Sequence, residues 1–170
     1  EPLEIKAETA HYEFAIPDEN KRAADSWLRE HSLPNHKNLV GFHIGSAPDF
    51  PWKRWPVENF VATGQECIAK QNAHILLFGG DDEANLKNKV KQELGTNATI
   101  VDADLLTAAA IMQHCTLFLS NDSGLMHLAA AAGVKTYGLF GPTDEQKTGP
   151  RGPQSFVIRA PGTEAAYNTE

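Results

Sequence analysis

Residues 116–143 read TLFLSNDSGLMHLAAAAGVKTYGLFGPT, and this stretch decides the fold that we expect. It opens with an apolar run, Thr116–Leu119, of the kind found in strands buried on both faces of a sheet. The polar residues 120–124 can form a tight turn and cap a helix. A stretch with one apolar helical face follows, and Thr136–Phe140 forms a second apolar run. This order predicts two parallel strands joined by a helix, whose N-terminus offers free backbone N–H groups to an anion.

The same alternation runs through the rest of the chain. Further apolar runs predict strands at Leu39–Ile44, Ile75–Phe78, Thr99–Val101 and Phe156–Ile158. Stretches with helical periodicity separate them, and one of these, Leu105–Cys115, follows a candidate helix cap, Asp104. We therefore predict an α/β fold, a Rossmann-like parallel sheet with helices on both faces. The domain is expected to span residues 18–160, with residues 1–17 as an entry segment or linker and residues 161–170 as a loose tail.

The composition is that of a globular protein with an acidic balance. Hydrophobic residues make up 41% of the 170, and 22 acidic against 15 basic residues give a formal net charge of −7. This balance argues against nucleic acid as a partner, because a phosphate backbone requires a basic surface. A small anionic ligand stays possible, since it needs only a local positive site.

Cysteine usage and hydropathy indicate an intracellular setting. Cys67 and Cys115 both lie in predicted helices, without metal-site spacing or the density of a disulfide scaffold, so we expect two reduced, buried thiols. No apolar run reaches the roughly 20 residues of a membrane-spanning helix, and no signal peptide opens the chain. We expect a cytoplasmic protein. Because the first residue is Glu1 rather than Met, we also expect a piece of a longer protein.

Polar, turn-forming residues follow the predicted strands. They are Gly45-Ser46, Gly79-Gly80-Asp81, Asn121-Asp122-Ser123-Gly124 and Gly141-Pro142-Thr143. Because parallel α/β sheets bind ligands beyond the carboxyl ends of their strands, we expect these exits to form one site. The sequence motifs of dinucleotide-binding folds, P-loops and α/β-hydrolases are absent. The seven histidines lack metal-ligand spacing, so no metal is expected.

Three pieces of this region carry a family resemblance: Asp122-Ser123-Gly124, then His127, then Phe140-Gly141-Pro142-Thr143-Asp144. In this order they resemble the heptosyltransferase family of glycosyltransferases (glycosyltransferase family 9), which commonly has Thr where this chain has Ser123. The resemblance implies the C-terminal, donor-binding half of a two-domain GT-B enzyme. It also implies inverting, metal-independent transfer of a sugar to the core of lipopolysaccharide, with heptose from ADP-heptose as the expected donor.

Partners and a division of labour follow from the same resemblance. The general base that activates the acceptor is expected in an N-terminal domain, so this chain alone should bind the donor without completing transfer. Its partners would be the sugar nucleotide, the lipopolysaccharide-core acceptor and that N-terminal domain, in the cytoplasm or at the inner face of the membrane. No cofactor beyond the nucleotide-sugar donor is implied. Two alternatives stay open: a non-catalytic sugar-nucleotide-binding module and a domain of the UDP-sugar epimerase type.

The resemblance assigns roles to residues of the central stretch. Asp122, Ser123 and Gly124 would hold phosphate, although such residues also serve as plain helix caps. His127 would contact the diphosphate, against the alternative of a histidine packed in the core. Ser46 and Thr143, at two other strand exits, belong to the same expected substrate-binding set.

Two charged segments complete that set. Either Lys53 or Arg54 would contact the leaving diphosphate, with Lys53 favoured, although a loop cation is commonly just solvated. Glu83 or Asp82 would bind the ribose hydroxyls, although carboxylates at this position also suit the dipole of the next helix. Lys53 and Arg54 lie in a predicted loop, residues 45–56, that also holds large apolar residues. We expect these to be partly exposed and to promote self-association: Phe50, Trp52 and Trp55.

Overall fold

A single sheet of six parallel strands forms the centre of the computed structural model, which describes residues 14–33 and 38–163. The strand order is β3-β2-β1-β4-β5-β6, and every neighbouring pair is parallel. The strands are β1 (Leu39–His43), β2 (His74–Phe78), β3 (Ala98–Ile100), β4 (Cys115–Asn121), β5 (Thr136–Phe140) and β6 (Ser155–Arg159). This arrangement confirms the predicted Rossmann-like α/β fold.

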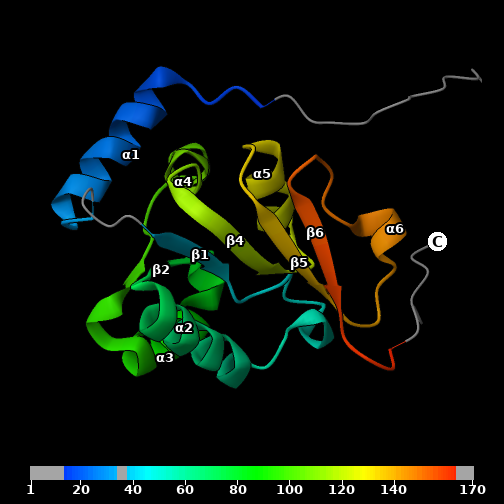
Figure 1. Cartoon of the computed structure of the whole chain (residues 1–170). Helices are drawn as coiled ribbons and strands as arrows, with labels where there is room; N and C mark the ends of the chain where they lie inside the picture. The colour runs from blue at the N-terminus through cyan, green and yellow to red at the C-terminus, as the bar shows by residue number, and fades with distance from the viewer. Residues whose placement is uncertain (1–13, 34–37, 164–170) are drawn as a thin grey trace, which may run out of the picture.

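Helices cover both faces of the sheet (Figure 1). They are α1 (Asp18–Glu30), α2 (Val57–Gln71), α3 (Ala84–Leu94), α4 (Leu105–Met112), α5 (Gly124–Ala131) and α6 (Glu145–Thr148). The first, fourth and fifth of these helices share one face with a core that includes Trp27 and Phe118. The second and third lie on the other face, over a core that includes Phe42 and Phe60. Successive strand residues point to opposite faces, so the apolar strands supply both cores at once.

The sheet has a switch point between β1 and β4. From β1 the chain runs outward through β2 to β3, then returns across the sheet to β4 and continues outward through β5 to β6. The helices after β1 and β4 therefore lie on opposite faces, and a crevice opens between them at the carboxyl ends of these two strands. Ligands of doubly wound sheets bind in such a crevice.

The structure corrects the predicted boundaries of α4 and β4. α4 ends at Met112, and Cys115 is the first residue of β4 rather than the last residue of a helix. Ser120 and Asn121, expected in the turn, instead prolong β4. Both cysteines are free; Cys67 is half-buried and Cys115 is buried. Burial raises the pKa of both thiols, which makes them poor nucleophiles.

Some expectations concern segments at the two ends of the chain. Most of the predicted entry segment 1–17, and residues 164–170 of the predicted tail, lie outside the described residues. Within the described part of the entry segment, Ile16 is buried against the core beneath α1. Among the described helices, none combines the length and hydropathy that crossing a membrane would require.

Candidate functional site

A pocket of about 810 Å³ opens at the carboxyl ends of β1, β2 and β4, within the size range of small-molecule sites. Its apolar wall comes mainly from α4, α5 and Phe14. Its polar lining residues are His43, Ser46, Asp82, Glu83, Ser123 and His127. The predicted convergence of strand exits is therefore confirmed for the exits of β1, β2 and β4.

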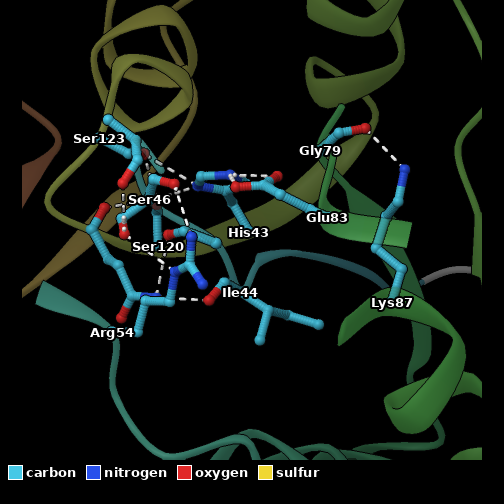
Figure 2. Close-up of polar contacts among 12 residues, drawn as sticks. His43, Ile44, Ser46, Arg54, Gly79, Glu83, Lys87, Ser120 and Ser123 are labelled. Atoms are coloured by element: carbon cyan, nitrogen blue, oxygen red, sulfur yellow. Dashed lines mark hydrogen bonds and ion pairs between the residues drawn. The ribbon is translucent and has the colours of Figure 1, made fainter. Parts of the chain in front are cut away.

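His43, the last residue of β1, joins three elements at the floor of this pocket (Figure 2). Its side chain is only 4% exposed. Nε2 lies 3.0 Å from a carboxylate oxygen of Glu83, and Nδ1 lies 2.9 Å from the Ser123 hydroxyl and 3.2 Å from the Ser120 hydroxyl. From the sequence alone His43 is predicted only as a strand residue, because nothing local indicates these long-range partners.

Glu83 reaches His43 because two glycines leave room for its carboxylate. A Cβ on Gly45 would lie 1.5 Å from a Glu83 oxygen, and one on Gly79 would lie 2.2 Å from the other. Gly79 also has a φ of +143°, which L side chains rarely adopt. The Lys87 ammonium donates a 2.7 Å hydrogen bond to the Gly79 carbonyl and braces this turn (Figure 2).

The buried position of Glu83 separates it from its exposed neighbours Asp81 and Asp82. Burial raises the pKa of Glu83, but the hydrogen bond and charge of His43 outweigh this effect, assisted by a Gly80 backbone bond and the charge of Arg54. The pKa therefore lies below its ordinary value, and Glu83 is a buried carboxylate. Dipole compensation alone does not account for Glu83, because its buried carboxylate also pairs with His43. Its predicted contact with ribose remains a prediction.

Asn121 holds together the backbone segments beside the pocket through its side-chain hydrogen bonds. Its side-chain amide donates to the carbonyls of Ile44, at 2.7 Å, and Gly45, at 3.1 Å. Its side-chain oxygen accepts a 2.9 Å bond from the backbone N–H of Trp55. One buried side chain thus ties the end of β4 to the exit of β1 and to the following loop. From the sequence alone Asn121 is predicted only as a turn residue.

The two candidate cations of that loop have different partners. The Lys53 ammonium lies 2.7 Å from a carboxylate oxygen of Asp122, just before α5 begins. Arg54 turns inward instead, and its guanidinium donates to the hydroxyl of Ser46 at 3.0 Å and to its carbonyl at 3.1 Å. The Ser46 hydroxyl in turn donates to the Phe50 carbonyl at 2.9 Å. Arg54 therefore shapes the loop, whereas Lys53 lies beside the start of α5.

The remaining predicted residues lie around the N-terminus of α5. Ser123 is its cap and accepts a hydrogen bond from the Met126 N–H. Gly124 is exposed at the first helical position, and His127, one turn further on, is half-buried and lines the pocket. Thr143 is not among the residues that line this pocket; it is buried, and its carbonyl accepts a 2.7 Å bond from Arg159. Across residues 14–33 and 38–163, no cluster of three or more His, Cys, Asp or Glu side chains could hold a metal ion.

A parallel sheet with a pocket at its switch point and a helix N-terminus beside that pocket defines a Rossmann-like α/β domain with a candidate ligand site. The family model of glycosyltransferase family 9 (heptosyltransferase) matches residues 1–170. The chain therefore belongs to this family, as the motifs around Ser123 and Phe140 indicated.

Characterised proteins and solved structures resemble the chain. It is 28% identical over 149 residues to lipooligosaccharide heptosyltransferase 2 of Haemophilus influenzae, covering 84% of the chain and 42% of that protein. It is 34% identical over 124 residues to the Campylobacter jejuni lipooligosaccharide heptosyltransferase 2, covering 69% of the chain and 38% of that protein. A family 9 glycosyltransferase structure from Veillonella parvula superposes with a TM-score of 0.75 at 29% identity, over 91% of this chain and 43% of that one. The chain thus spans less than half the length of the curated relatives it matches.

Proposed function

We propose that this chain is the donor-binding domain of a GT-B heptosyltransferase that uses ADP-heptose to glycosylate a lipopolysaccharide core. The observation that carries the proposal is the N-terminus of α5 at the switch-point pocket, capped by Ser123 and flanked by the Lys53–Asp122 pair. A helix N-terminus binds phosphate through free N–H groups and its dipole. The adjacent apolar wall of the pocket suits a nucleoside.

We also propose that transfer is inverting and independent of a metal, and the charges at this site support the second point. Negative charge develops on the diphosphate as it leaves the sugar, and fixed positive groups aimed at that charge stabilise the transition state. The α5 N–H groups, the Lys53 ammonium and His127 would supply these groups. In this role Asp122 holds Lys53 in place, and Glu83 and Ser46 shape the opposite side of the pocket.

Acceptor activation is assigned to a second domain. A two-domain transferase orients donor and acceptor across a cleft, and correct orientation alone supplies effective molarities of about 10⁵ M or more. We propose that an N-terminal domain provides the general base and the lipopolysaccharide-core site, in the cytoplasm at the inner face of the membrane. The isolated 170 residues would then bind the donor and transfer nothing.

Calorimetric titration tests the donor site directly. We expect ADP and ADP-heptose to bind, and UDP and GDP to bind more weakly. Lys53→Ala should lower ADP affinity by about tenfold to a hundredfold, because charge-assisted hydrogen bonds contribute about 1.5–3 kcal/mol each. Lys89→Ala is the matched control, since Lys89 pairs with Glu58 on the surface. Preference for UDP would favour an epimerase-like domain, and unchanged affinity in Lys53→Ala would refute this placement of the diphosphate.

A transfer assay tests the division of labour. The isolated chain is incubated with ADP-heptose and a lipopolysaccharide-core acceptor, beside a full-length family member as positive control. We expect product only from the full-length enzyme. Efficient transfer by the 170 residues alone would place the general base within them and would make Asp122 and Asp144 the candidates to test.

A further inference from the structure

The hydrogen atoms around His43 can be assigned one by one from the contacts. Ser120 donates its hydroxyl hydrogen to the Asn121 carbonyl, 2.7 Å away. It therefore has no hydrogen left for His43, whose Nδ1 is 3.2 Å from the Ser120 oxygen. Among the described residues, the other hydroxyl in contact with Nδ1 is that of Ser123, at 2.9 Å. The Ser123 oxygen also lies 3.1 Å from the Ser120 oxygen, so Ser123 has two possible acceptors, of which Nδ1 is the nearer.

Glu83 fixes the other ring nitrogen. Both carboxylate oxygens lie within 3.2 Å of Nε2, and a carboxylate can only accept a hydrogen bond. Nε2 must therefore carry a hydrogen. In a neutral imidazole Nδ1 is then an acceptor. We assign the hydroxyl hydrogen of Ser123 to Nδ1, at 2.9 Å, rather than to the Ser120 oxygen, at 3.1 Å. In this state the Ser123 hydroxyl donates inward, away from any anion at the start of α5.

A second proton on His43 reverses this bond. With hydrogens on both nitrogens, Nδ1 becomes a donor to the Ser123 oxygen, and the Ser123 hydroxyl hydrogen is released. Ser123 lines the pocket at the N-terminus of α5, so the released hydroxyl can donate to an anion there. No covalent bond forms or breaks: one proton comes from solvent to Nδ1, and one hydrogen bond changes direction.

We propose that His43 is a positioning residue that takes up a proton when a nucleoside diphosphate binds, and so turns the Ser123 hydroxyl toward the phosphate. The inference deepens the proposed function and rests on it. The charged groups that surround His43 suit this role. Glu83 compensates an imidazolium directly, whereas Lys53 and Asp122 neutralise each other. Arg54 acts on Glu83, and Asp82 and His127 line the same pocket.

Proton uptake is measurable by titrating ADP calorimetrically at pH 7.5 in Tris and in HEPES, which differ in ionisation enthalpy. At this pH the terminal phosphate of ADP is largely ionised, because the second pKa of such a phosphate is about 6. We expect the wild-type chain to take up a fraction of a proton per ADP, and its affinity to fall by up to about tenfold per pH unit as the pH rises. His43→Gln should bind ADP without proton uptake and with little pH dependence.

His127→Gln is the decisive second variant, because His127 is the other histidine of the pocket. It should retain proton uptake whatever its effect on affinity. His114 directly precedes the first residue of β4, at the end of the strand remote from the pocket. His114→Gln should therefore show the same proton uptake and ADP affinity as the wild type. Loss of uptake in His127→Gln with retention in His43→Gln would overturn the proposal, as would absence of uptake in the wild type. Circular dichroism of each variant checks that it is folded.

The free protein offers a test that is independent of the ligand. Nitrogen-15 spectra of the histidine rings at pH 8 report which nitrogen carries the hydrogen. We expect the Nε2–H form at His43, and an Nδ1–H form would overturn the inferred direction of the Ser123 bond. If ADP fails to bind at all, the proposed function fails, while this measurement still decides how Ser123 and His43 are hydrogen-bonded.

Discussion

Lys53 and Asp122 form a pair whose two members are unequally shielded from water. The side chain of Lys53 is 17% exposed and that of Asp122 is 6% exposed. Lys53→Met would leave a buried carboxylate without its cation, so we expect it to lower the free energy of unfolding by about 1–3 kcal/mol. Urea denaturation of the purified variant measures this loss.

A double-mutant cycle separates the pair from its surroundings. In Lys53→Met/Asp122→Asn neither charge remains, so the double variant should be more stable than the sum of the two single losses implies. Contacting residues typically show coupling of about 0.5–3 kcal/mol. Strict additivity would mean that the two side chains do not interact in solution.

Glu83 should make stability depend on pH in the acidic range. Although burial raises its pKa, His43, Gly80 and Arg54 together hold it below the ordinary 4.5. The ionised form is therefore favoured in the folded state. Its stabilisation is present above the ordinary pKa and is lost as the pH falls through the lower folded value. As the pH falls from the ordinary 4.5 through the lower folded pKa, the stability of the wild type should fall more steeply than that of Glu83→Gln. Parallel slopes in urea titrations would contradict this assignment.

At the scale of elements, α4 depends on its N-terminal cap. The Asp104 carboxylate accepts from the Leu106 and Thr107 N–H groups, both at 3.0 Å, and from the Thr107 hydroxyl. Asp104→Ala should lower the free energy of unfolding by about 1 kcal/mol, and Asp104→Asn should largely restore it, because Asn caps equally well. Asp144→Ala, which removes the cap of the four-residue α6, is the comparison and should cost less. Equal losses in the Ala and Asn variants of Asp104 would exclude capping as the cause.

The strands and helices could be predicted wherever burial of an element produces a recognisable pattern of apolar residues, either a continuous run in a strand or a helical periodicity. The runs at Leu39–Ile44 and Thr136–Phe140 are apolar throughout or nearly so, because both faces of a central parallel strand are covered. The pattern fails where polar residues are satisfied inside the sheet. Asn121 is buried in β4 because its amide pairs with the exit of β1, and a polar residue in sequence gives no sign of such a partner.

Only part of the site could be predicted, because only local signals can be recognised in the sequence. Turn residues at strand exits and the α5 cap are local signals, so Ser123 and the exit at Gly45-Ser46 could be found. His43 could not, since its partners lie 40 and 80 positions away in the sequence. The different surroundings of Lys53 and Arg54 were not predictable either, because Lys53 pairs with Asp122, 69 positions away, whereas Arg54 bonds to Ser46 within its own loop.

At the scale of the whole molecule, the two edges of the sheet differ. β3 is only three residues long, whereas β6 presents five residues along the other edge. Three of these are large and apolar, with exposed fractions of 43% for Phe156, 39% for Val157 and 48% for Ile158. An edge strand with exposed apolar side chains is a template for pairing with another chain. The loop near the pocket offers a second patch, at Phe50 and Trp52, whereas Trp55 packs against Phe60.

We expect β6 to dominate self-association of the isolated chain, because it is the longer edge strand of the sheet and also carries exposed apolar side chains. Ile158→Lys should shift the weight-average mass toward monomer in sedimentation experiments at high protein concentration, since an edge lysine opposes strand pairing. Ala23→Lys, on the exposed face of α1, adds the same charge to a chain of net charge −7 and should change little. Phe50→Lys should have a smaller effect than Ile158→Lys. A larger effect of Phe50→Lys would locate the contact in the loop that follows the pocket residues Ser46 and Ala47, and ADP would then be expected to compete with self-association.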